Sequence, residues 1–67
     1  MKITINGDLL EVPTTVTTVT SLLSHFQLGE KVVIVEKNGE ILQKEAHETA
    51  SVSNGDRFEL VHFVGGG

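Results

Sequence analysis

The chain is short and mildly acidic, with 67 residues, of which 39% are hydrophobic and 21% charged, a net charge of −4 and no cysteine. This length predicts one small domain with a single core, and the composition is typical neither of a disordered chain nor of a membrane protein. The five basic residues are scattered and form no patch for a nucleic-acid backbone. The lack of cysteine excludes a disulfide, a thiolate nucleophile and a cysteine-based metal site.

The start of the chain shows no targeting signal. No apolar run approaches the roughly 20 residues of a membrane-spanning helix, and Met1-Lys2-Ile3-Thr4 lacks the apolar segment of a signal peptide. We therefore expect a cytoplasmic protein that has neither nucleic acid nor a membrane among its partners. Its acidic charge favours encounters with a positively charged protein surface.

The first twelve residues predict a β-hairpin. Ile3 and Ile5 alternate with polar residues, which indicates a half-buried strand. Asn6-Gly7 is a residue pair that readily adopts positive φ angles, and it predicts a tight turn. A second strand is expected at residues 9–12. Pro13 ends it, because proline cannot donate a hydrogen bond to the sheet.

Residues 14–29 predict an extended connection followed by a helix. Thr18 fits the N-cap position, because its side-chain oxygen can accept from a free N–H group of the first turn. Gly29 is predicted to take the left-handed conformation just past the helix and to end it. The apolar residues of the helix have the spacing i, i+3, i+4 and i+7, which is more often core than a binding groove, and they are Val19, Leu22, Leu23 and Phe26.

The second half of the chain predicts three more strands. The run Val32-Val33-Ile34-Val35 is apolar on both faces and favours a strand deep in a sheet that is covered on both sides. Asn38-Gly39 predicts a turn into a short strand at residues 40–43. Residues 44–49 are polar and predict a loop, and the last strand is expected at residues 57–64.

The last predicted strand presents different residues on its two faces. Phe58 and Leu60 share the face that is expected in the core, whereas Val61 and Phe63 lie on the other face. We expect a small exposed apolar patch that docks a partner protein, formed by Ile34, Val61, Phe63 and Val64. The alternative is that these are single exposed apolar residues, which are common on protein surfaces.

The order of these elements predicts the fold. Two strands, a helix and three further strands indicate an α+β protein of the β-grasp type, with a mixed sheet of about four to five strands and one helix packed across one face. Residues 1–64 would form this single domain, and residues 65–67 would form a flexible C-terminal tail.

Three glycines, Gly65, Gly66 and Gly67, follow the last predicted strand without a polar spacer. Glycine has no Cβ, so such a tail is thin enough to enter a slot that a side chain would block. When extended, it reaches roughly 10 Å past Val64, which is enough to place a carboxylate in the active site of another protein. A carboxylate is a poor electrophile, so its activation has to come from elsewhere. The alternative is a frayed end or an expression remnant.

The body of the domain offers little catalytic chemistry of its own. His25, His47 and His62 are widely separated and have no ligand at the intervals that a metal site requires. There is no recognisable catalytic triad and no phosphate-binding loop. Since a chain this small is a weak candidate for a stand-alone enzyme, we expect a protein that other enzymes act on, with no metal of its own.

With this tail and this order of elements, the whole chain resembles the ubiquitin-like sulfur carriers, and among them the ThiS family of thiamine biosynthesis. The most specific parts of the resemblance are the ending Val61-His62-Phe63-Val64-Gly65-Gly66-Gly67 and the run Val32-Val33-Ile34-Val35-Glu36-Lys37-Asn38. The resemblance implies that Gly66 and Gly67 are the functional pair and that Gly67 is the modified residue. Gly65 exceeds the diglycine of the family, and we interpret it as a spacer.

The resemblance also implies a series of partners. A ThiF-type adenylating enzyme would use ATP and magnesium to convert the Gly67 carboxylate to an acyl adenylate. A persulfide sulfur donor would then replace the adenylate and leave a thiocarboxylate. Thiazole synthase, the ThiG-type enzyme, would take that sulfur into the thiazole ring. The carrier itself would bind no cofactor and would be a protein cosubstrate rather than an enzyme.

Three other functions stay open on the sequence alone. The sulfur carriers of molybdopterin synthesis share the ending, although they are typically longer and often have prolines where this chain has His62-Phe63-Val64. A ubiquitin-like modifier or noncovalent binding module would use the glycines as a conjugation handle or a linker. A small interaction domain with an inert tail is the third possibility.

Overall fold

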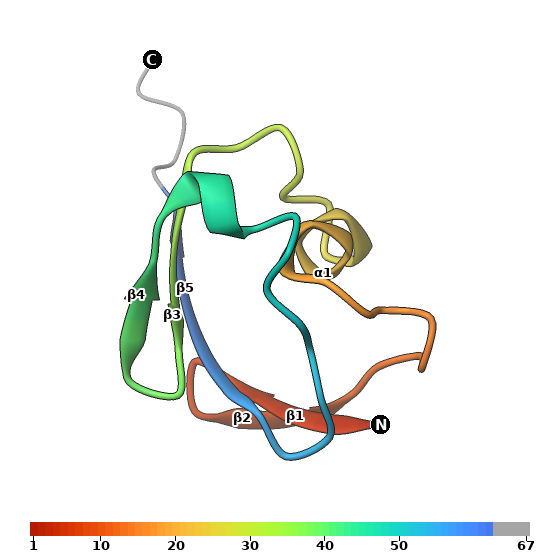
Figure 1. Ribbon diagram of the computed structural model, residues 1–67. Coiled ribbons are helices and arrows are strands. Elements are labelled where there is room, and N and C mark those ends of the chain that lie inside the picture. Colours follow the sequence, from red (N-terminus) through yellow and green to blue (C-terminus); the bar gives the residue numbers. More distant parts are fainter. Residues whose placement is uncertain (63–67) are drawn as a thin grey trace.

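Residues 1–62, which are the residues that the computed structural model describes, form a five-stranded mixed sheet crossed on one face by a helix (Figure 1). The strands lie in the order β2-β1-β5-β3-β4. This arrangement confirms the predicted β-grasp fold, whereas the predicted boundary between domain and tail lies outside the described residues. The elements are β1 (Lys2–Ile5), β2 (Asp8–Glu11), α1 (Val19–His25), β3 (Val33–Lys37), β4 (Glu40–Leu42), the 3₁₀ helix η1 (Lys44–Ala46) and β5 (Arg57–His62).

The N-terminal hairpin forms as predicted. β1 pairs antiparallel with β2, and the turn between them has positive φ angles of 50° at Asn6 and 87° at Gly7. On its other side β1 pairs with β5 in parallel, with Thr4 opposite Arg57. β5 in turn pairs antiparallel with β3. β5, the last strand within residues 1–62, therefore lies in the centre of the sheet, with a neighbour on each side.

The start of α1 confirms Thr18 as the N-cap residue. The backbone N–H of Ser21 donates to Oγ1 of Thr18 (3.2 Å), and the backbone N–H of Thr18 donates to Oγ of Ser21 (3.0 Å). This reciprocal pair is a capping box, with serine in the place that glutamate or glutamine more often occupies. The helix therefore begins where the sequence predicts.

The end of α1 differs from the prediction. Gln27, not Gly29, takes the left-handed conformation, with φ of 61°. The N–H of Gln27 donates to the carbonyl of Ser24 (3.0 Å), and the N–H of Leu28 donates to the carbonyl of Leu23 (2.7 Å). These two bonds form a Schellman motif, which also places Leu28 against the core. The helix ends two residues early because packing of Leu28 favours this turn over the local preference for glycine.

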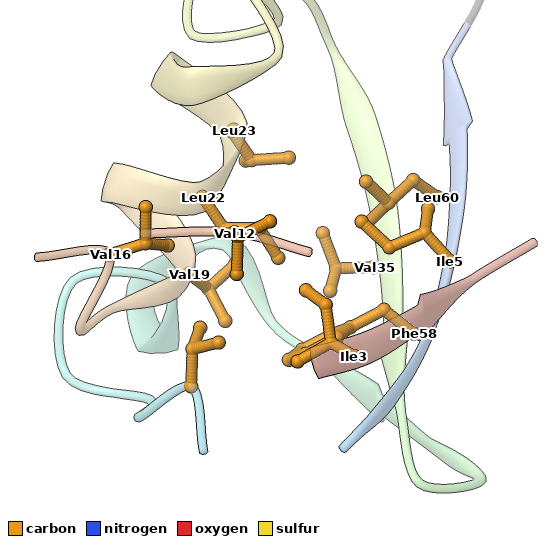
Figure 2. Packing of buried hydrophobic residues seen from close by; sticks show 11 residues of the cluster. Ile3, Ile5, Val12, Val16, Val19, Leu22, Leu23, Val35, Phe58 and Leu60 are labelled. Atoms are coloured by element: carbon orange, nitrogen blue, oxygen red, sulfur yellow. The ribbon is translucent and has the colours of Figure 1, made fainter. Parts of the chain in front are cut away.

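The core lies between α1 and the inner face of the sheet (Figure 2). Figure 2 shows Leu22 and Leu23 of the helix pointing toward Val35 and Leu60 of the sheet. The predicted apolar stripe of the helix is buried except for Phe26, which is half-buried. The largest fully buried side chains come from both layers and from the connection before the helix, and they are Phe58, Ile3, Leu22, Val12, Val19 and Val35.

The prediction that β3 is covered on both sides is wrong for the described residues. Val35 is fully buried, but Ile34 is 45% exposed, and Val32, just before the strand, is 74% exposed. The one α-helix of residues 1–62 packs on a single face, so alternate residues of β3 face away from it. The apolar run therefore supplies exposed side chains to the protein surface as well as a buried one to the core.

The connection at residues 44–49 contains more structure than the predicted loop. It holds η1 and a buried residue, His47. The N–H groups of Val19 and Thr20, in the first turn of α1, donate to the carbonyls of Ala50 (3.0 Å) and His47 (2.9 Å). A helix cannot satisfy these groups itself, so this connection completes its N-terminus. Because the contacts use backbone atoms, the side-chain pattern gave no sign of them.

Within residues 1–62, the helices lack the combination of length and hydropathy that a membrane span requires.

Candidate functional site

The candidate site begins where β5 ends, at His62. Beyond it, Phe63 and Val64 of the predicted patch and the predicted tail, Gly65 to Gly67, lie outside the described residues. The structure therefore describes the base of the site: the strand that leads to the tail and the sheet surface beside that strand.

Asn6 fixes the strand that leads to the tail. Its backbone N–H donates to the carbonyl of Phe58 (2.9 Å), its Nδ2 donates to the carbonyl of Leu60 (3.1 Å), and its Oδ1 accepts from the N–H of Leu60 (2.8 Å). The Asn6 side chain thus continues the hydrogen bonding between β1 and β5 beyond Ile5, the last residue of β1. The sequence marked Asn6 as a turn residue, but nothing in it indicated this second role.

Two residues of the predicted patch are brought together on the outer face of the sheet. Ile34 of β3 lies directly opposite Val61 of β5 in the antiparallel register. Their exposed fractions are 45% and 52%, respectively. Facing pairs of this kind have their Cβ atoms about 4.5–5.5 Å apart, so the two side chains form one continuous apolar surface. The next cross-strand pair, Val33 and His62, is the last in β5 and leads directly to the tail.

The outer face also carries residues that the sequence did not assign to the site. Ile41 of β4 is 65% exposed and lies opposite Glu36 of β3, which in turn lies opposite Glu59 of β5. An exposed isoleucine and two carboxylates therefore form the row next to the Ile34–Val61 pair. Ile41 and Glu36 were missed because strand register, which sets these neighbours, cannot be determined from the spacing of residues along one strand.

A separate groove of about 720 Å³ lies between α1, the start of β3 and the segment around η1. Its lining combines apolar side chains with charged ones of both signs, among them Leu23, Val32, Val33, Lys31, Lys44 and Glu45. His47 also lines it and is buried, and its Nε2 has no hydrogen-bond partner within residues 1–62. The lining does not include Ile34 or Val61, so the groove is distinct from the patch. Within the described residues, no three His, Asp or Glu side chains are grouped to hold a metal.

Comparison with known protein families gives a match over nearly the whole chain. Residues 2–67 match the model of the ThiS family. The sulfur carrier protein ThiS of Bacillus subtilis is 48% identical over 50 residues, which are 75% of this chain and 76% of that protein. The thiazole synthase of Paramagnetospirillum magneticum is 37% identical over 67 residues. These residues are 100% of this chain and only 20% of that protein.

Comparison with solved structures agrees on fold and family. The crystal structure of the thiamine biosynthesis protein ThiS from Geobacter metallireducens superposes with a TM-score of 0.83. The two sequences are 39% identical, and the match covers 100% of both chains. A solution structure of the Geobacter metallireducens protein gives the same TM-score and identity, and the match covers 88% of that chain.

Proposed function

The chain belongs to the ThiS family of sulfur carrier proteins of thiamine biosynthesis, and on that premise we propose that it carries sulfur as a thiocarboxylate on Gly67. The observation that supports this proposal most directly is the position of β5. This strand is held in the centre of the sheet by β1 and β3, and it leads from the exposed Ile34–Val61 pair toward the glycines. A partner that docks on the pair would therefore lie close to the tail.

The first proposed step is activation of Gly67 by a ThiF-type adenylating enzyme. The Gly67 carboxylate attacks the α-phosphorus of ATP, pyrophosphate leaves, and an acyl adenylate forms. Magnesium belongs to the ATP that the enzyme binds, because phosphate oxygens are its usual ligands. The carrier supplies no cofactor and no catalytic side chain to this step. It supplies the docking face, for which we propose Ile34, Val61, Phe63 and Val64, and the thin tail of Gly65, Gly66 and Gly67.

The second proposed step transfers sulfur. The outer sulfur of a persulfide on the donor attacks the acyl carbon, and AMP leaves. The resulting acyl disulfide is reduced by a thiol, which releases the Gly67 thiocarboxylate. We propose that thiazole synthase then accepts this sulfur. The Paramagnetospirillum magneticum protein supports this choice, because a segment similar to this whole chain occurs inside a protein named thiazole synthase.

Intact-mass measurement tests the proposal. We would incubate the purified chain with ATP, magnesium, the ThiF-type enzyme of the same organism, a persulfide donor and a thiol. The expected result is a mass gain equal to the exchange of one oxygen for one sulfur, localised to Gly67 by fragmentation. The control omits ATP and should show no gain. An unchanged mass under conditions that load a known ThiS protein would contradict the proposal, and adducts of the whole chain on lysine would indicate a modifier instead.

A deletion strain tests the pathway. Loss of the gene should create a growth requirement for thiamine or its thiazole precursor, and the wild-type gene should remove that requirement. A requirement for a molybdenum cofactor function, with thiamine synthesis intact, would assign the carrier to molybdopterin synthesis.

A further inference from the structure

The outer face of the sheet carries two carboxylates that face each other. Glu36 of β3 and Glu59 of β5 are directly opposite in the antiparallel register. Their Cβ atoms are therefore about 4.5–5.5 Å apart, and like charges in this arrangement destabilise the sheet. Glu59 is exposed and Glu36 is partly buried. Neither side chain belongs to the core, so core packing does not account for two carboxylates at these positions.

Neither glutamate of this pair forms an ion pair within the described residues. The two ion pairs found within residues 1–62 are Met1 with Glu11 and Lys37 with Asp56. Lys37 follows Glu36 in the chain, but its Nζ donates to the carbonyl of Ser51 (2.9 Å). Arg57 lies two positions before Glu59 in β5, yet it forms no ion pair within 4.0 Å with either carboxylate in the part of the chain that the structure describes. Both carboxylates therefore lack an ion-pair partner among residues 1–62.

The carboxylates lie between exposed apolar side chains. Ile41 is opposite Glu36, and the Ile34–Val61 pair forms the adjoining row of the same face. A protein that covered these apolar residues would also remove water from the carboxylates. Two desolvated negative charges would oppose such an interface unless the partner supplied a positive group between them. The face therefore favours a partner with an apolar surface and a cation at this position.

We propose that Glu36 and Glu59 together receive an arginine guanidinium of the adenylating enzyme, next to the apolar contact at Ile34 and Val61. A planar guanidinium can donate to two carboxylates at once, which a compact ammonium does less well. A second copy of this chain does not fit, because it would bring four carboxylates together. This inference rests on the proposed function and adds the charge recognition that would select the partner.

The test uses the carrier and the ThiF-type enzyme of the same organism. Glu36→Gln, Glu59→Gln and the double variant remove charge with little change of shape. Glu45→Gln and Glu48→Gln, singly and together, are matched controls, because they remove the same charge from the η1 segment. Affinity is measured by calorimetry at low and high salt, and stability of the free carrier by urea unfolding.

We expect Glu36→Gln and Glu59→Gln each to weaken binding by roughly tenfold to a hundredfold at low salt, because each leaves the guanidinium partly unpaired in the interface. The double variant should also show a smaller salt dependence than the wild type. The free carrier should be as stable as the wild type or more stable, since a repulsion is removed. The control variants should change affinity by less than about threefold, because their charges lie around η1 and not in the row formed by Glu36 and Glu59.

Three results would overturn the proposal: affinity of the double variant equal to that of the wild type, an equal loss in the control variants, or a fall in stability that accounts for the lost binding. Stabilisation of the free carrier by Mg²⁺ or Ca²⁺ that depends on both glutamates would overturn it too, because it would make the pair a metal site. If the wild type gains sulfur but the double variant binds normally, this inference alone fails. If the wild type neither binds nor gains sulfur, the proposed function fails with it.

Discussion

The two faces of strands β3 and β5 differ in how deeply their apolar side chains are buried. On the inner face Val35 and Phe58 are fully buried beneath α1, whereas on the outer face Ile34 and Val61 stay half-exposed. These residues are immediate or near neighbours in sequence, and alternation alone assigns them to opposite sides. One strand can therefore supply side chains to the core and to an exposed surface at once. A substitution on the outer face can then leave the stability of the core unchanged.

The size of the domain makes this division necessary. A domain of this length has a stability of about 3–10 kcal/mol, so one core side chain accounts for a large share of it. Apolar residues on the outer face gain little from folding, because they remain in contact with water. Under the proposed function, these residues are buried against a partner instead. Substitutions on each face show how strictly the two faces are separated, and the largest effect is expected in the core.

Phe58→Ala should produce the largest loss of stability. Phe58 is fully buried between the sheet and α1, and truncation of such a side chain costs about 3–5 kcal/mol. The variant should be largely unfolded at moderate urea concentrations. Urea unfolding followed by circular dichroism measures the change, and a loss of less than about 1 kcal/mol would show that the core repacks around the gap.

Val61→Thr is the matched change on the outer face of the same strand. It keeps the β-branched shape that strands favour, so the free energy of unfolding should change by less than about 1 kcal/mol. Affinity for the ThiF-type enzyme should fall, because a polar group replaces part of the apolar patch. Calorimetry measures the affinity. A stability loss like that of Phe58→Ala would show that the outer face also supports the fold.

Asn6 does not fit the contrast between a buried face that stabilises the fold and an exposed face that binds a partner. It is exposed, yet its side chain holds β5 in place. Asn6→Ala removes both side-chain bonds to Leu60 and places alanine at a φ of 50°. We expect a loss of about 2–4 kcal/mol, from two hydrogen bonds and the cost of the left-handed conformation. Asn6→Gly should be less harmful by about 1 kcal/mol, since glycine tolerates this φ. Equal losses would assign the whole effect to the hydrogen bonds.

Asn6 also shows how far the sequence could predict this protein. Local patterns correctly located the hairpin turn, the Thr18 cap, the apolar stripe of α1 and the alternation of β5, because short-range chemistry determines each of them. The bonds from Asn6 to Leu60 and the opposition of Glu36 to Glu59 depend on which strands pair and in what register. That information comes from tertiary packing, which spacing along one segment does not reveal.

The end of α1 gives a smaller test of local preference against packing. Gln27→Gly should stabilise the domain by up to about 1 kcal/mol, because glycine adopts the observed φ of 61° without strain. Gly29→Ala should be nearly neutral, since an added Cβ would lie 3.8 Å from the nearest atom, the Cα of Ser24, which is ordinary contact. Thermal unfolding of both variants measures the difference. A costly Gly29→Ala and a neutral Gln27→Gly would restore Gly29 as the residue that ends the helix.

The smallest expected effect concerns an exposed polar contact at the edge of the sheet. The N-terminal ammonium of Met1 donates to Oε2 of Glu11 (2.8 Å), and this hydrogen bond and charge lower the pKa of the Glu11 carboxyl from its ordinary value of 4.5. A carboxyl whose pKa is lower in the folded state stabilises the fold above its unfolded pKa and loses that contribution as the pH falls through the folded value. Glu11→Gln should therefore unfold with a slightly flatter dependence on pH below about 4.5 than the wild type, as urea midpoints from pH 6 to pH 3 would show. Parallel curves would mean that this contact contributes nothing to stability in solution, as for many exposed ion pairs. In that case the stability of the domain would come from the buried inner face and from backbone pairing, without a contribution from this surface charge.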